Sequence, residues 1–211
     1  SSVLYSHSER TYNSLTVNGT LSHWNNTTEA VDPYFIDLNI TNDFTINTGG
    51  KVDLTGKGYQ PEAGPGAGGN AVRYRGSGGA GHGGAGGNGQ DGILGGIEYD
   101  TETDNPTMLG SGGGNSSYCG TLGGRGGGAI IMSIGGNAII GGEILADGTA
   151  GSPSFGNCAG GGGSGGTVNL TANIISGASN IYARGGAGGN GSGPDGGGGA
   201  GGRIALKYNS S

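Results

Sequence analysis

The chain has 211 residues, of which 57 are glycine, and a formal net charge of −6. Glycine follows no strict Gly-X-Y period with abundant proline, which excludes a collagen triple helix. Nine basic residues stand against fifteen acidic ones without forming a basic cluster, so nucleic acid and anionic membranes are poor candidates for partners. No stretch approaches 18 consecutive apolar residues, and the opening SSVLYS lacks the features of a signal peptide. We therefore expect a mature chain or an excised module without membrane insertion.

Residues 1–28 differ in character from the rest of the chain, being polar with scattered aromatic side chains. We expect the first short strands at 15–17 and 20–22, where they would form a partial first coil. Two interpretations of this N-terminal segment remain open. Residues 3–17 could be donated as a strand to a neighbouring subunit, or the segment could cover the edge of its own domain, which we place at residues 29–211.

Short runs rich in Val, Ile and Thr, separated by Gly and Asn, predict strands along that domain. Strands that begin at 129, 167 and 203 are separated by 38 and 36 residues, a period typical of solenoids. No window shows a convincing helical period. The predicted fold is therefore all-β, a parallel β-helix in which the chain winds through successive sheets. The expected strands are 35–40, 43–47, 51–54, 129–134, 137–140, 143–146, 167–172, 173–175, 180–183 and 203–208.

Gly-rich tracts at 147–166 and 184–202 connect the last coils, and a longer insertion occupies about 55–128. Such tracts could be flexible linkers. Alternatively, glycine allows extended, polyglycine-like segments with three residues per turn to pack in close contact. Because disordered loops of nearly twenty residues in every coil would argue against a compact fold, we favour ordered insertions.

The long insertion contains one histidine, His82, within the glycine run 79–87, and four acidic side chains at alternate positions from Glu98 to Asp104. His82 could be a ligand, although a histidine that fills a gap beside bare backbone is the simpler interpretation. The acidic residues would share one face of a strand and could bind calcium. Their spacing lacks the glycine turn of an EF-hand loop, which favours a solvated acidic loop.

The two cysteines, Cys119 and Cys158, both lie in Gly-rich segments and are 39 residues apart, about one repeat. A parallel coil would stack such positions on adjacent coils. Their even number and the lack of a CxxC pair favour a disulfide over zinc or redox chemistry, while two free thiols would be expected in a cytosolic protein. The disulfide interpretation indicates an oxidising compartment.

Matches to the Asn-x-Ser/Thr glycosylation pattern point to the same compartment. They occur at Asn18, Asn25, Asn26, Asn39, Asn115, Asn169, Asn190 and Asn209. We therefore expect covalent glycans on an extracellular or cell-surface protein.

The succession of LNIT at 38–41, KGY at 57–59, GPGAG at 64–68, GAGHGGAGG at 79–87, LGSGGG at 109–114 and a final GGRIAL at 201–206 resembles the Gly-rich β-helical modules of very large secreted and cell-surface proteins. It also resembles, more loosely, the subunits of glycosylated extracellular fibrils. The resemblance covers residues 14–208. The resemblance implies a β-helical architecture and a secreted or cell-surface location. It implies no catalytic residues.

Catalysis by a β-helix requires paired carboxylates or clustered acidic and basic groups on one face. The acids of this chain are scattered, so we predict no catalytic, cofactor-binding or metal-binding residues and no enzyme. The expected function is that of a structural subunit that assembles head to tail with itself into an extracellular glycosylated filament or matrix. The alternative is a glycan-binding adhesin module, which would use exposed aromatic side chains.

Overall fold

The computed structural model describes residues 2–3, 9–26, 34–153, 157–190 and 192–209, with residues 2–3 described as backbone only. Within these residues the regular elements are all strands, and they form three parallel sheets. Sheet A consists of β1 (Ser2–Val3), β4 (Thr20–Ser22), β7 (Lys51–Asp53), β10 (Glu143–Leu145) and β13 (Ile181–Tyr182). Sheet B consists of β2 (Arg10–Tyr12), β5 (Ile36–Ile40), β8 (Ala129–Ile134), β11 (Thr167–Ala172) and β14 (Arg203–Tyr208). Sheet C consists of β3 (Leu15–Val17), β6 (Phe44–Ile46), β9 (Asn137–Ile140) and β12 (Ile174–Ser176).

The chain visits the sheets in the order B, C, A, and one such passage forms a rung of the solenoid. Successive rungs pair in parallel and in register, so that Thr167 lies between Ala129 and Arg203. The predicted repeat of strand starts at 129, 167 and 203 is therefore confirmed, and the other predicted strands agree with the structure to within about one residue. The sequence prediction missed β1 and β2, which belong to the first rungs.

A column of apolar side chains from each sheet fills the interior of the solenoid. In sheet B the strand β5 alternates between buried Ile36, Leu38 and Ile40 and the less buried side chains between them. This alternation of period two directs one face of each strand into the core. Phe44, Val52 and their counterparts on other rungs supply the remaining sides of one continuous cluster. The core is therefore built by stacking equivalent positions of successive rungs.

Asparagines mark the corner between sheets B and C. Asn42 donates its side-chain amide to Asn13 Oδ1 at 2.7 Å, and the backbone amide of Asn42 donates to the carbonyl of Asn13. At the other end, Asn209 repeats both kinds of contact with Asn173. Backbone and side-chain hydrogen bonds thus continue the ladder around a corner at which the strands themselves are interrupted.

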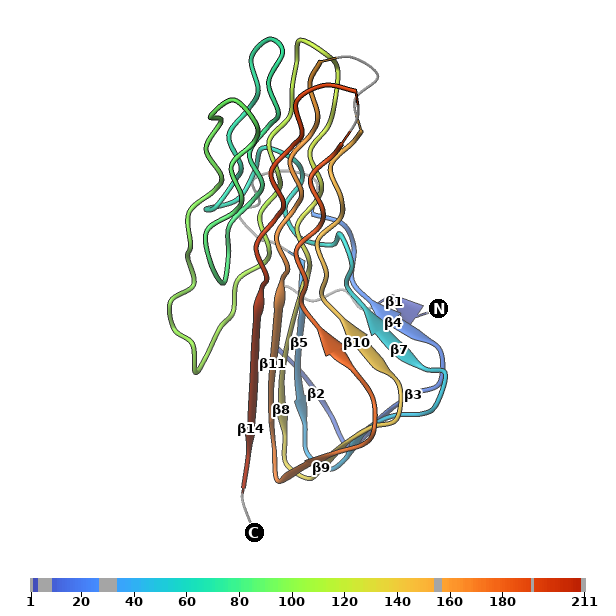
Figure 1. The fold of residues 1–211 in the computed structure, drawn as a ribbon. Helices are drawn as coiled ribbons and strands as arrows, with labels where there is room; N and C mark the ends of the chain where they lie inside the picture. Colours follow the sequence, from blue (N-terminus) through green and yellow to red (C-terminus); the bar gives the residue numbers. More distant parts are fainter. Residues whose placement is uncertain (1, 4–8, 27–33, 154–156, 191, 210–211) are drawn as a thin grey trace.

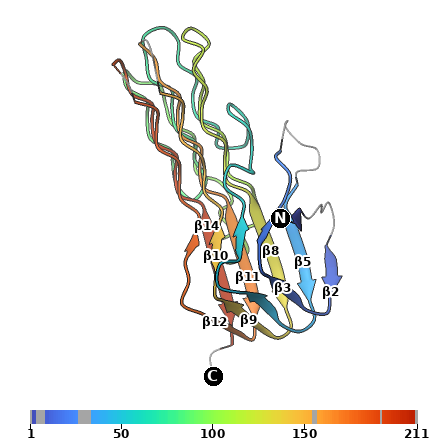
Figure 2. The same ribbon diagram turned by 90° about the vertical axis from the view of Figure 1, so that its right-hand side faces the viewer.

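All three Gly-rich segments leave the solenoid at the opposite corner, between sheets A and B. They follow β7, β10 and β13 and return to β8, β11 and β14. Figure 1, viewed with β14 in front, and Figure 2 show these three segments as a bundle of long undulating stretches that run side by side away from the sheets. This bundle projects to one side, and the two ends of the solenoid are left outside it.

The Gly-rich segments bond to one another through their backbones. Gly161, for example, donates its amide to Gly114 O at 3.0 Å and accepts a bond at 2.8 Å from the amide of Gly124. A Cβ atom at position 161 would overlap the carbonyl group of Gly78 on a neighbouring segment. The backbone of Gly161 lies outside the left-handed region, so the position requires glycine for close approach and not for its φ angle.

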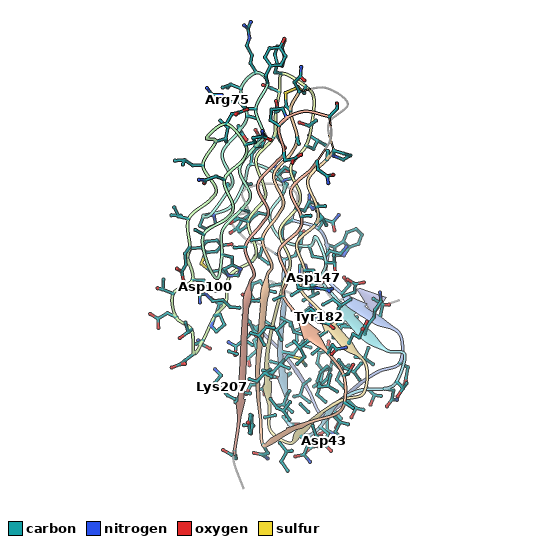
Figure 3. The ribbon with its side chains drawn as sticks, viewed as in Figure 1. Asp43, Arg75, Asp100, Asp147, Tyr182 and Lys207 are labelled. Atoms are coloured by element: carbon teal, nitrogen blue, oxygen red, sulfur yellow. A yellow bond between two sulfur atoms is a disulfide. The ribbon has the colours of Figure 1, made fainter. Side chains whose placement is uncertain are left out.

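An ionic contact fixes the root of the bundle. The guanidinium of Arg184 donates from Nε to Asp147 Oδ2 at 3.0 Å, and the Arg184 amide donates to Oδ1 at 2.6 Å. The same guanidinium lies 4.1 Å from the centre of the Tyr182 ring. These residues come from successive rungs, and Figure 3 shows Asp147 and Tyr182 where the bundle meets sheet A. The contact therefore joins two neighbouring insertions at the point where they leave the solenoid.

We predict that Gly161→Ala lowers the free energy of unfolding by about 3 kcal/mol or more, because the added methyl group meets backbone that cannot move aside. Gly84→Ala is the matched control, since a Cβ at position 84 meets nothing within 4 Å. We expect the control to change stability by less than about 1 kcal/mol. Urea unfolding followed by circular dichroism measures both, and equal losses would contradict close backbone packing of the bundle.

Candidate functional site

The most site-like feature of the solenoid is its open end at β14. This strand is the last of sheet B, with β11 on one side and no described strand on the other. Its side chains Ile204, Leu206 and Tyr208 occupy the inward-facing columns that are buried on β11, yet they are 44%, 38% and 62% exposed. A row of unpaired backbone groups beside exposed apolar side chains is a template for another strand.

At the opposite end of the solenoid, too, no described strand covers the last strand of any sheet. The edge strands there are β1, β2 and β3, one in each sheet. Tyr12 on β2 is exposed, and Arg10 lies in the same column as Leu38 and Leu206. The strands β2, β3 and β4 pair with β5, β6 and β7 of the same chain. In this structure the N-terminal segment is thus the first rung of its own solenoid, the second of the two interpretations drawn from the sequence.

His82 lies fully buried where the long insertion meets sheet B. Its ring stacks on Tyr99 with 4.5 Å between the ring centres, Nδ1 lies 2.7 Å from Gly165 O, and Nε2 lies 3.4 Å from a carboxylate oxygen of Asp100. Burial lowers the pKa of His82, although the bonds to Gly165 and Asp100 oppose that shift. A neutral, enclosed imidazole of this kind fills a gap beside backbone, the simpler of the two roles considered from the sequence.

The acidic stretch from Glu98 to Asp104 forms no strand. Asp100 is turned inward, where it accepts the backbone amides of Thr107 and Met108 at 3.1 and 3.0 Å. Glu98 accepts a bond at 2.8 Å from Arg203 on β14, whereas Glu102 and Asp104 are exposed. The expectation of a solvated acidic loop is therefore wrong for Asp100, whose carboxylate holds the segment against sheet B. Among the described residues, no cluster of His, Cys, Asp or Glu is arranged to hold a metal ion.

A disulfide joins Cys119 and Cys158, with Cα atoms 6.0 Å apart. The two cysteines lie in Gly-rich insertions, in the segments that follow β7 and β10, and not on stacked strands of the solenoid. These two segments belong to successive rungs, so the disulfide predicted between Gly-rich segments of adjacent coils is confirmed. The bridge ties together two insertions that already bond through their backbones.

The far end of the bundle exposes aromatic and basic side chains. Tyr118 donates its hydroxyl to that of Tyr74 at 3.1 Å, and the two rings meet edge to face. The guanidinium of Arg73 lies 5.8 Å from the centre of the Tyr118 ring. Figure 3 shows the adjacent Arg75 at this end, far from Lys207 on β14. Such a surface has the amphipathic rings that sugar or protein ligands contact.

The predicted glycosylation sites differ in access. Asn18, Asn25, Asn190 and Asn209 are exposed, and Asn39 and Asn115 are partly buried. Asn26 and Asn169 are buried, and the Nδ2 atom of each donates two hydrogen bonds. A glycan is attached through Nδ2, so the folded chain presents six of the eight sites for modification. We therefore no longer propose Asn26 and Asn169 as glycosylation sites.

His23 is a second buried imidazole, placed between the first rung and the root of the bundle. Its Nδ1 lies 2.8 Å from Trp24 O, and Nε2 is buried without a hydrogen-bond partner. Burial lowers the pKa of His23 to about 4, the Trp24 carbonyl opposing and Lys57 adding to the shift. The sequence around His23 does not indicate this burial, because Gly128, which lies against the ring, is far along the chain.

Comparison with known proteins gives no relative from which a role could be transferred: no family model, curated protein or solved structure matches the chain. Within the described residues there is also no helix with the length and apolar character needed to span a bilayer. We therefore infer the function from the geometry of this chain.

We predict that acid destabilises the fold through its buried histidines. His23 has a lower pKa when folded than the usual 6.5, so the unfolded chain binds more protons as the pH falls. The free energy of unfolding should therefore decrease from pH 6.5 to pH 4, by on the order of 3 kcal/mol for this residue. In His23→Gln that share of the slope should be lost. Parallel stability curves for wild type and variant over this range would contradict the assignment.

We predict that replacing both cysteines by alanine lowers the free energy of unfolding by about 4 kcal/mol, the entropy expected for opening a loop of this length. Thermal or urea unfolding of the oxidised wild type, the reduced wild type and the double variant measures the effect. The reduced wild type and the variant should agree. An unchanged midpoint would show that backbone bonding alone holds the two insertions together.

Proposed function

We propose that this chain is a structural subunit of an extracellular, glycosylated filament or surface matrix, and that it assembles head to tail. The observation that carries the proposal is the open end at β14, where inward-facing Ile204, Leu206 and Tyr208 are exposed. The apolar core is exposed to solvent at this end, and another copy would cover the exposed side chains.

The geometry of the ends favours a polymer over a closed dimer. The paired strands of the described residues run parallel, and the two ends of the solenoid present different edges, β14 at one end and β2 at the other in sheet B. A contact between the β14 end of one copy and the β2 end of the next is heterologous, and such contacts propagate when they do not close into a ring. Donation of residues 3–17 to a neighbour is not part of this proposal, since β2 and β3 are already paired within the chain.

Location outside the cell is supported by two features. The disulfide between Cys119 and Cys158 suits an oxidising compartment. Asn18, Asn25, Asn190 and Asn209 are exposed acceptors for glycans, with Asn39 and Asn115 partly accessible. The glycans would then coat the sides of the filament.

The lateral bundle gives the filament a second component. We propose that its Gly-rich segments are ordered insertions of the polyglycine type, extended with three residues per turn. The backbone bonds among Gly114, Gly124 and Gly161 support this role, as does the overlap that a Cβ at position 161 would create. Each subunit would then carry one stiff arm beside the filament axis.

An adhesin that binds glycans is the second candidate, and the exposed pair of Tyr74 and Tyr118 with Arg73 favours it. A glycan array separates the two roles. Saturable binding by monomer that is lost in the Tyr74→Ala, Tyr118→Ala double variant would support the adhesin. A filament without such binding would support the structural role alone.

We predict that the purified chain forms filaments visible by electron microscopy. Ile204→Asp should reduce the amount of protein assembled into filaments at least tenfold, because the carboxylate would occupy the core position at the joint. Ile139→Asp is the matched control. Ile139 is similarly exposed, at 42% against 44%, but lies on an internal strand. Monomers of the wild-type chain would overturn the proposal.

We also predict that intact mass of material from the native source falls on enzymatic removal of N-linked glycans. Peptide mapping should place the modifications among the six accessible sites and not at Asn26 or Asn169. Unmodified native protein would refute the glycoprotein part of the proposal and leave the filament part to the microscopy.

A further inference from the structure

Within the part of the chain that the structure describes, each end of the solenoid carries an incomplete rung. Along the chain, a complete rung consists of a strand in sheet B, then one in C, then one in A, as in β5, β6 and β7. The strand β1 lies in sheet A before the first complete rung, and β14 lies in sheet B after the last one. Among the described residues, the first partial rung therefore provides only its A strand and the last only its B strand.

The two partial rungs complement each other. We infer that two copies of this chain join by sharing one mixed rung, in which β14 of one copy supplies the B strand and β1 of the next copy supplies the A strand. This inference rests on the proposed head-to-tail polymer and specifies its joint. Sheets A and B contain five strands each, so a repeat of five rungs makes both sheets continuous through the joint. Sheet C contains only four strands, so the C position of the mixed rung has no described strand.

The register inside the chain fixes the register across the joint. In sheet B the printed pairs form the column Thr11, Asn39, Ser133, Thr171 and Lys207. If the next copy continues this column, its Thr11 lies beside Lys207 of the first copy. In the same way Ser2 of the next copy lies beside Ile181, because the column of sheet A runs through Ser2, Leu21, Val52, Ile144 and Ile181.

The side chains at the joint fit this register. Tyr12 of the next copy comes over Tyr208, so two exposed aromatic rings at the ends of sheet B cover each other. Arg10 of the next copy comes over Leu206, where its methylene groups cover the leucine and its guanidinium reaches water through the open level of sheet C. At the corner between sheets B and C, Asn13 of the next copy would follow Asn209, and asparagines on neighbouring rungs of one copy bond in this way, as Asn42 does to Asn13 and Asn209 to Asn173.

A joint without sharing would have a different length. With the mixed rung, each copy advances the filament by five rungs, about 24 Å at the usual spacing between strands. If the two partial rungs stacked as separate levels, each copy would add six rungs, about 29 Å, and sheets A and B would both be interrupted. The axial rise of the filament thus distinguishes the two joints without any substitution.

The register is tested by cysteine cross-linking. Lys207→Cys with Thr11→Cys puts two cysteines side by side on the outer face of sheet B, at the separation of neighbouring parallel strands, which a disulfide can bridge. Within one copy they lie on the two end strands of the five-stranded sheet, too far apart to react. Lys207→Cys with Glu9→Cys is the control, in which the second cysteine is shifted by two residues along the chain.

We expect filaments of the wild-type chain to show a rise of about 24 Å by cryo-electron microscopy. Filaments of the first variant, assembled under reduction and then oxidised, should give a ladder of disulfide-linked oligomers on a non-reducing gel, with at least a tenfold higher yield than the control. A rise near 29 Å, or equal or greater cross-linking of the shifted pair, would overturn the mixed rung while leaving the polymer intact. A wild-type chain that forms no filaments would overturn the proposed function itself, and the mixed rung with it.

Discussion

The in-register pairing of each rung with the next is the interaction on which the rest of the structure depends. A rung of this solenoid consists of short strands that bury little by themselves, and its apolar side chains are covered only when equivalent residues stack above and below, as Ile130 does between Ile36 and Val168. In the outermost rung, the apolar side chains have a neighbouring rung on one side only and stay partly uncovered. On β14, the residues that continue these buried columns are exposed, and the constraint that builds the domain therefore creates the surface through which we propose that it polymerises.

The Gly-rich insertions meet a complementary constraint. They all leave the solenoid at the corner between sheets A and B, so they lengthen the molecule sideways and do not obstruct its ends (Figure 2). Backbone carbonyls occupy the space that side chains would need, as Gly161 shows against Gly78, and backbone amides supply the bonds between neighbours. A segment without side chains has little apolar surface to bury. The few side chains that the tracts carry add contacts of their own: Asp147 bonds to Arg184 at the root of the bundle, and a disulfide joins Cys119 to Cys158.

The period of the repeat and most strands were predictable because they are local patterns of apolar residues bounded by glycine and asparagine. The strand β2 was not, since Arg10, Thr11 and Tyr12 are all exposed and show no alternation; only their pairing with β5 makes them a strand. Burial imposed by distant segments was equally hidden. Asn169 is covered by residues near 105, and Asp100 is drawn inward by His82 and the amides that follow it, so neither the blocked glycosylation site nor the inward carboxylate has a signature in its own neighbourhood. The disulfide was predictable because Cys119 and Cys158 lie in Gly-rich segments about one repeat apart, and these segments belong to successive rungs.

Fibre diffraction from aligned filaments tests the central claim, continuous stacking of rungs from one copy to the next, most directly. Strands that lie across the filament axis and pair in parallel along it should give a meridional reflection near 4.8 Å. Since a single copy is only about five rungs deep, a sharp reflection requires coherent stacking over many copies, and that is the result the account predicts. A broad 4.8 Å reflection, or one found on the equator, would show that the rungs do not continue through the joint and would contradict it.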